Sequence, residues 1–205
     1  KEKHGIGEDD FTIIFVGRLA SEKNVEFLLN AQRKLIEKRI TNIKLLIVGD
    51  GPEKENYINI SRKLNIFDKV IFTGKIEQDK IQYYYQCADA FVTASNSETQ
   101  GLTVIEAMAA GVVPICINDM AFIDMLPKKS LFNNQKEYIN RLITFSTDEE
   151  LRKEYKDNID IPNVVDALKK QGYDVVFFNT DEGDKIADCY GMADILKRVN
   201  AITYS

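Results

Sequence analysis

Histidine is almost absent from this sequence: among 205 residues it occurs once, as His4, close to the first residue. We therefore expect neither a histidine-based catalytic triad nor a zinc site with histidine ligands in this chain. The three cysteines, Cys87, Cys116 and Cys189, are widely spaced and form no Cys-x-x-Cys pair. Each lies among apolar or small residues, which favours buried thiols in a reducing, cytoplasmic setting over a metal or disulfide framework.

Long apolar runs and an excess of basic residues are also lacking. No apolar run approaches about 18 residues, so we expect no membrane span. Residues 1–4 are mostly charged, which excludes a signal peptide at this terminus, and the missing initial Met suggests an excised piece. Lys and Arg total 27 against 32 Asp and Glu, a net charge of −5 that argues against nucleic-acid binding. With 44% hydrophobic residues, the chain is not disordered, and its length suits one large domain or two small ones.

Short apolar runs alternate with longer segments of helical periodicity over the first 117 residues. Nearly continuous hydrophobicity in the short runs is typical of parallel strands that are covered on both faces. Strands are expected at 11–16, 44–48, 70–73, 90–93 and 113–117, and helices at 25–36, 53–65, 78–87 and 102–111. This alternation predicts an α/β fold, a Rossmann-like doubly wound parallel sheet.

The remaining residues carry weaker patterns. Surface helices are expected at 135–145 and 148–156, the second with Ser146 or Thr147 as its N-cap. Further on we expect a helix at 163–171, a strand at 174–178 and a helix at 184–198. The prediction is a Rossmann-like domain in residues 1–160 and a C-terminal strand–helix extension in 161–205. That extension is either an extra strand–helix unit or a tail that crosses back.

Loops that leave the expected strands carry the residue types that hold a nucleotide. Such sheets bind ligands beyond the carboxyl ends of their strands. In the first loop, Gly17 allows a tight exit, and Arg18 and Lys23 could neutralise a diphosphate. The alternative is a solvated loop with an ordinary salt bridge to Glu22.

Two further strand exits contain glycine. Residues 49–52, Gly-Asp-Gly-Pro, would let the backbone at Gly51 approach a ligand, although they also form a good turn. After Gly74, main-chain groups near Lys75 and Ile76 could contact the edge of a base, or could belong to a plain loop.

The segment 94–111 is the most informative. A polar turn with Gly101 precedes a helix whose first N–H groups would attract phosphate. Glu98 and Glu106 are eight residues apart, about 12 Å along a helix axis, wider than the roughly 5 to 9.5 Å of hydrolytic carboxylate pairs. They suit the two ends of one elongated ligand. Taken singly, Glu98 could be a first-turn acid and Glu106 the partner of a neighbouring lysine.

Five features occur in order: Gly17-Arg18, Glu22-Lys23-Asn24, residues 49–52, Gly74 and the pair Glu98 and Glu106. Together they resemble the C-terminal, donor-binding half of a GT-B glycosyltransferase, and more narrowly the retaining family GT4 with its Glu-x7-Glu motif. The resemblance covers residues 8 to 117 and extends more loosely to 158. Residues 83–86 and 97–103 further resemble bacterial diacylglycerol glucosyltransferases.

The resemblance implies a role for each position. Arg18 and Lys23 would hold the donor diphosphate, Glu98 the sugar hydroxyls and Glu106 the ribose hydroxyls, with Arg18, Lys23 and Glu98 as the catalytic set. The other donor-binding residues would be Gly17, Gly51, Lys75, Ile76, Thr99, Gln100, Gly101, Leu102 and Thr103. The donor would be a nucleotide sugar, UDP-glucose in the finer assignment, and no metal or other cofactor is expected. Transfer would retain the anomeric configuration, with the leaving diphosphate stabilised electrostatically.

A GT-B enzyme also needs an N-terminal acceptor-binding domain, so this chain alone should bind a donor without turnover. The acceptor would be a lipid or a cell-surface glycan. A basic cluster, Arg33, Lys34, Lys38 and Arg39, would fit peripheral association with the inner face of the plasma membrane, although a solvated helix face is the favoured explanation. The family often has a glycine-containing turn near the position of residues 127–132. This chain has no glycine there and so departs from the family pattern in that loop. The rival hypothesis is a non-catalytic nucleotide-binding or scaffold module of the same fold.

Overall fold

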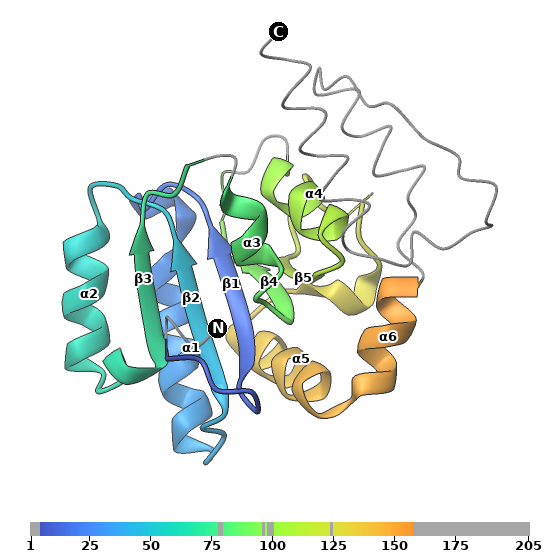
Figure 1. The fold of residues 1–205 in the computed structure, drawn as a ribbon, viewed down its shortest axis with the longest axis horizontal. Helices are drawn as coiled ribbons and strands as arrows, with labels where there is room; N and C mark the ends of the chain where they lie inside the picture. The colour runs from blue at the N-terminus through green and yellow to red at the C-terminus, as the bar shows by residue number, and fades with distance from the viewer. Residues whose placement is uncertain (1–4, 78–79, 96, 98–100, 124, 158–205) are drawn as a thin grey trace, which may run out of the picture.

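A computed structural model describes residues 5–77, 80–95, 97, 101–123 and 125–157 (Figure 1). Its centre is a six-stranded parallel sheet in the order β3-β2-β1-β4-β5-β6. The strands are β1 (Phe11–Val16), β2 (Ile43–Val48), β3 (Val70–Gly74), β4 (Ala90–Thr93), β5 (Val113–Ile117) and β6 (Leu131–Phe132). The five expected strands and the α/β Rossmann-like class are confirmed. The sixth was not predicted, because two residues are too few to show a periodicity.

Helices cover both faces of the sheet. One face carries α1 (Val25–Glu37), α2 (Lys54–Lys63), α5 (Gln135–Thr147) and α6 (Glu149–Asp157), and the other carries α3 (Ile81–Tyr85) and α4 (Leu102–Ala109). Figure 1 shows α1 and α3 on opposite sides of the strands. The middle strand β1 contributes Phe11, Ile13 and Phe15 to one buried cluster and Ile14 and Val16 to the other. Because both sides of β1 are covered, its sequence is apolar except for the buried Thr12.

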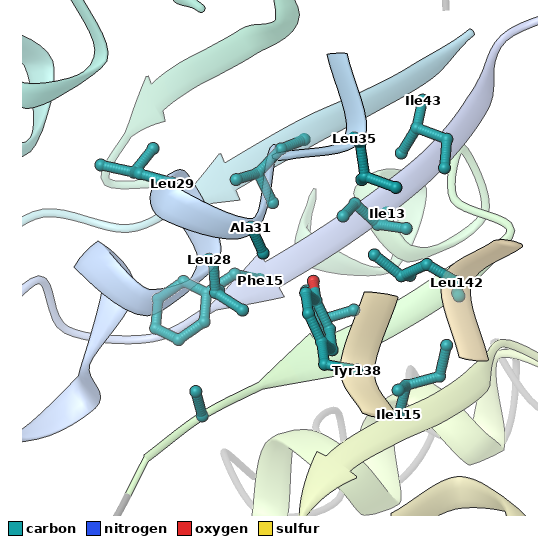
Figure 2. Close-up of a cluster of buried hydrophobic side chains, with 14 of the residues drawn as sticks. Ile13, Phe15, Leu28, Leu29, Ala31, Leu35, Ile43, Ile115, Tyr138 and Leu142 are labelled. Carbon is teal, nitrogen blue, oxygen red and sulfur yellow. The ribbon is translucent and has the colours of Figure 1, made fainter. Parts of the chain in front are cut away.

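The larger cluster fills the space between β1 and the helices α1 and α5. Figure 2 shows side chains from these three elements meeting: Ile13, Phe15, Leu28, Leu35, Tyr138 and Leu142. Each of these six side chains is no more than 1% exposed. The spacing of Leu28 and Leu35 on α1 is the helical repeat that the sequence displays, so one apolar stripe directs α1 onto the sheet.

The N-cap predicted for the last described helix was wrong. Asp148 Oδ1 accepts a hydrogen bond from the Leu151 N–H at 2.8 Å, so Asp148 caps the first turn of α6. Ser146 and Thr147 belong to the final turn of α5, and both hydroxyls donate to the Ile143 carbonyl at 2.9 Å. The sequence pattern missed this because α5 runs two residues beyond its last expected position.

Several predictions concern residues that the structure does not describe. The expected helix at 163–171, strand at 174–178 and helix at 184–198 lie outside the described residues, as does Cys189. Of the other thiols, Cys116 is fully buried, as expected, whereas Cys87 is only half-buried. None of the helices in the described ranges is long and apolar enough to cross a membrane.

Candidate functional site

The strand order reverses between β1 and β4. From β1 the chain builds the sheet outward through β2 and β3, then returns to place β4 on the other side of β1. Two loops therefore leave adjacent strands at the same edge and diverge: residues 17–24 after β1, and the segment between β4 and α4. This kind of switch point opens a crevice beyond the carboxyl ends of the strands, where open α/β sheets bind ligands.

Asn24 connects these two loops. Its side-chain Nδ2 donates a hydrogen bond to the Ala94 carbonyl, directly after β4, at 3.3 Å. Its backbone is left-handed, with φ 51° and ψ 39°, between the short 3-10 helix η2 (Ser21–Lys23) and the start of α1. Asparagine tolerates this conformation better than most residues. Asn24 therefore allows the left-handed turn of the backbone, and its side chain spans the switch point.

The two predicted diphosphate ligands, Arg18 and Lys23, both lie on the loop after β1. Arg18 is exposed, and its guanidinium forms no ion pair with Glu22 or with any other residue that the structure describes. Lys23 is half-buried at the end of η2, where its N–H donates to the Ala20 carbonyl at 3.0 Å. The loop therefore places two cations at the switch point, and their contact with a diphosphate stays a prediction.

Glycines let the exits of β1, β2 and β3 pack against one another. Gly49 has φ 143°, and a Cβ added there would lie 1.8 Å from the Gly17 carbonyl oxygen. A Cβ on Gly51 would lie 2.4 Å from the Leu19 carbonyl oxygen. The Gly49 N–H in turn donates to the Gly74 carbonyl at 3.0 Å. These glycines have a packing reason to be present, so a donor contact from Gly17 or Gly51 stays a prediction.

The Asp50 carboxylate organises the neighbouring turn. It accepts hydrogen bonds from Lys54 Nζ and from the Gly51 N–H, each at 2.8 Å. The Lys54 hydrogen bond, followed by the Gly51 one, lowers the pKa of Asp50, and the backbone of Lys75 adds a smaller contribution in the same direction. Lys75 is exposed and Ile76 is half-buried beside this turn. Their predicted main-chain contacts with a base stay untested.

The helix after β4 starts as the sequence predicts. Gly101 has φ 62° and is the N-cap of α4, and its carbonyl accepts from the N–H groups of Val104 and Ile105 at 3.0 Å. Gly101 has no side chain to cap this end, so the amides of Leu102 and Thr103 have no acceptor within the helix. Such amides, with the helix dipole, form the type of anion site that was expected here. Glu98, Thr99 and Gln100 lie outside the described residues.

Glu106 is buried on α4, with an exposed fraction of 8%. Its Oε2 accepts a hydrogen bond from the Tyr85 hydroxyl, at the end of α3, at 2.9 Å. Burial, together with the charge and hydrogen bond of Glu106, raises the pKa of Tyr85 well above its ordinary value, so the phenol stays protonated as a donor. One partner of Glu106 is thus a tyrosine from another helix, which sequence reasoning did not consider.

Sequence reasoning missed the role of this tyrosine. A run of three tyrosines at 83–85 favours packing of a helix onto the sheet over stacking on a base. Tyr85 does pack there, with its ring centroid 6.3 Å from that of Phe91 in β4. Tyr83 instead is 50% exposed. No local signal marks the hydroxyl of Tyr85 as a partner of Glu106, because 21 residues separate the two.

The basic cluster lies on α1 and just after it. Arg33 forms an ion pair with Glu37 at 2.9 Å, and its guanidinium also donates to the Leu64 carbonyl at 3.4 Å. Lys34, Lys38 and Arg39 are exposed. One of the four cations is thus engaged by the protein itself. In the part of the chain that the structure describes, no group of three or more His, Cys, Asp or Glu side chains is placed to hold a metal ion.

Comparison with known proteins identifies the family. The profile of the group 1 glycosyl transferases matches residues 1–160. The chain belongs to this family. It is 34% identical over 132 residues to alpha-monoglucosyldiacylglycerol synthase of Streptococcus pneumoniae, and 35% identical over 147 residues to the protein of the same name from Acholeplasma laidlawii. These matches cover 64% and 70% of the chain.

The glycosyl transferase chain spans only about a third of the length of these relatives, 30% and 36% respectively. Among solved structures, the catalytic domain of cholesterol-alpha-glucosyltransferase from Helicobacter pylori is similar, with a TM-score of 0.66 and 25% sequence identity. That match covers 78% of this chain and 98% of the other. The likeness in fold therefore extends over nearly the whole of that catalytic domain.

Proposed function

We propose that this chain is the donor-binding half of a retaining glycosyltransferase that moves a hexose, glucose from UDP-glucose, to a lipid or cell-surface glycan acceptor. The observation that carries the proposal is the switch point. The loop with Arg18 and Lys23 follows β1, and the segment that leads to α4 follows the neighbouring strand β4. The Asn24–Ala94 hydrogen bond joins these two segments. Relatives named as glucosyldiacylglycerol synthases support glucose and a lipid acceptor.

The donor would be held along its length. Arg18 and Lys23 bind the diphosphate from one loop, and the amides of Leu102 and Thr103 contact it from the start of α4. Glu106 accepts hydrogen bonds from the ribose hydroxyls, and Glu98 does the same for the sugar. Main-chain groups at Lys75 and Ile76 contact the base.

This arrangement supports transfer mainly through charge. When the bond between the anomeric carbon and the diphosphate oxygen breaks, negative charge accumulates on the leaving diphosphate. The two cations and the helix start would stabilise that charge more strongly than they stabilise the intact donor, which lowers the barrier. The acceptor hydroxyl then bonds through its oxygen to the anomeric carbon on the face that the diphosphate left and gives its proton to the departing diphosphate oxygen, so configuration is retained.

The acceptor would bind to a second Rossmann-like domain, N-terminal to this half in the whole enzyme. Its absence from this chain fits the one-third share of the relatives that the chain spans. Alone, the chain would bind donor without turnover. In the whole enzyme, the exposed cations Lys34, Lys38 and Arg39 would add to peripheral association with an anionic cytoplasmic leaflet.

Calorimetric titration of UDP, UDP-glucose and GDP-mannose tests this proposal. Glu106→Ala should weaken UDP itself, because the ribose is common to UDP and UDP-glucose. Glu98→Ala should weaken UDP-glucose more than UDP, because only the former carries the sugar. Glu55→Ala, an exposed glutamate on α2, is the matched control and should change neither.

Equal losses for both ligands in Glu98→Ala would contradict the assigned roles. If the folded chain binds no nucleotide sugar at millimolar concentration, the donor-binding function is wrong and a scaffold module is the better description.

A further inference from the structure

The phenol of Tyr85 is a buried hydrogen-bond donor that contacts Glu106, the residue proposed to bind the ribose. Tyr85 is the last residue of α3, and its side chain is 1% exposed. Two acceptors on α4 lie within reach of its hydroxyl: Glu106 Oε2 at 2.9 Å and the Thr103 carbonyl at 3.3 Å. A phenol has one hydrogen to donate, and the shorter contact to an ionised acceptor is the stronger of the two.

The ring of Tyr85 cannot easily move away from Glu106. It belongs to the cluster of buried apolar side chains that α3 and α4 form against the sheet, and it lies against Phe91 of β4. Close packing of this kind leaves a large side chain few rotamers. The position of the hydroxyl is therefore set by the sheet, and the hydroxyl in turn restrains the carboxylate of Glu106, which has rotamer freedom of its own.

A buried carboxylate is costly unless donors surround it. A carboxylate that recognises hydroxyl groups must also be held in one orientation, because a shift of about 1 Å in a supporting shell is enough to loosen a site. Tyr85 contributes to both needs of Glu106 through one hydrogen bond. A purely structural pair would meet only the first.

We propose that Tyr85 is a positioning residue for donor recognition: its hydroxyl holds the Glu106 carboxylate in the orientation that meets the ribose hydroxyls, so it helps the site to select ribonucleotides over nucleotides without those hydroxyls. The inference rests on the proposed function, in which Glu106 binds the ribose. Selection of this kind is strong, because a ligand that lacks the hydroxyls leaves a buried polar group unpaired.

The test compares UDP with 2′,3′-dideoxy-UDP in wild type and in Tyr85→Phe. Loss of one hydrogen bond to a charged group should raise the Kd for UDP about tenfold, while the Kd for dideoxy-UDP stays nearly constant. On a Glu106→Ala background, Tyr85→Phe should cause no further loss, because the carboxylate that it positions is gone.

Tyr138 supplies a matched control. It is fully buried in the cluster on the opposite face of the sheet, and its hydroxyl has no hydrogen-bond partner among the described residues. Tyr138→Phe removes the same oxygen and should leave the affinities for both ligands unchanged. If Tyr85→Phe does not fold, 3-fluorotyrosine at Tyr85 keeps the ring packing but changes donor strength. The Kd for UDP should then shift without a shift for dideoxy-UDP.

The outcomes distinguish a failure of the proposed function from a failure of the role proposed for Tyr85. A folded wild type that binds no UDP overturns the proposed function, and the inference with it. A wild type that prefers UDP, together with a Tyr85→Phe variant that keeps the full preference, overturns the inference alone. Equal weakening of both ligands in Tyr85→Phe also overturns it, since it would show that Tyr85 supports only the fold.

Discussion

Replacing Asn24 tests how firmly the two loops at the switch point are joined. Asn24→Gly removes the hydrogen bond from Nδ2 to the Ala94 carbonyl but still accepts the backbone φ of 51°. Asn24→Ala removes the same hydrogen bond and also forces a side chain with a Cβ into the left-handed region. The two variants therefore divide the contribution of Asn24 into a side-chain part and a backbone part.

The magnitudes follow from the geometry. A typical neutral hydrogen bond contributes about 0.5–1.5 kcal/mol, and the 3.3 Å separation places this part-buried one at the lower end. The freer unfolded chain of a glycine variant costs about 0.4–1 kcal/mol more. A left-handed alanine costs roughly 1–2 kcal/mol. We expect Asn24→Ala to lower the free energy of unfolding more than Asn24→Gly.

Asn65 allows the hydrogen bond to be measured by itself. It follows α2 with φ 53°, its side chain is exposed, and that side chain makes no hydrogen bond to any residue that the structure describes. Asn65→Gly and Asn65→Ala thus carry the backbone costs without the bridge. In urea unfolding followed by circular dichroism, the Asn24→Gly loss should exceed the Asn65→Gly loss by about 0.5–1 kcal/mol.

Two results would refute this reasoning. Equal losses in Asn24→Gly and Asn65→Gly would mean that the bridge across the switch point contributes nothing to stability. A loss in Asn24→Gly as large as that in Asn24→Ala would mean that the left-handed backbone is not what selects asparagine here. A calorimetric titration of UDP with the same variants should show weaker binding for Asn24→Gly than for Asn65→Gly, because only Asn24 joins the proposed diphosphate loop to β4.

Three further predictions concern a strand exit, a helix cap and a turn. Gly49→Ala should lower the free energy of unfolding by at least about 3 kcal/mol or prevent folding, because the new Cβ would lie 1.8 Å from the Gly17 carbonyl oxygen; a cooperative melt like that of wild type would contradict the close packing of these exits. Asp148→Ala should lower the free energy of unfolding by about 1 kcal/mol, because it removes the cap of α6. Thr147→Ala should lower it less, because Thr147 is not a cap, and thermal unfolding measures both. Because the folded pKa of Asp50 is lowered, its contribution to stability is present above its ordinary value of 3.8 and is lost as the pH falls through the folded value. Asp50→Asn should therefore flatten the acid limb of the stability curve, and an unchanged limb would count against the Asp50–Lys54 pair.

Much of the fold could be predicted because its strands carry a strong local signal. β1 and β4 are covered on both faces, so each is a short run that is apolar apart from Thr12 and Thr93, and it stands out from the amphipathic helices around it. α1 displays a single apolar stripe because only one of its faces packs against the sheet. β6 has only two residues, Leu131 and Phe132, and it follows the short 3-10 helix η5 (Lys128–Ser130), so no repeat could reveal it. The cap at Asp148 was missed because an N-cap side chain accepts from the unpaired N–H groups of the first helical turn, and the exact end of α5 decides which residue precedes that turn.

Sequence alone determined five of the six strands, the order of the main elements along the chain and the residue types at the strand exits, because these depend on burial and on hydrogen bonding over a few residues. The tertiary structure decided which of the loops that leave the strands are neighbours. Only the placement of β4 beside β1 brings Ala94 to Asn24, 70 residues earlier, and only the packing of α3 against α4 brings the Tyr85 hydroxyl to Glu106. Contacts over such separations depend on which strands and helices pack together. Local patterns of hydrophobicity do not specify that packing.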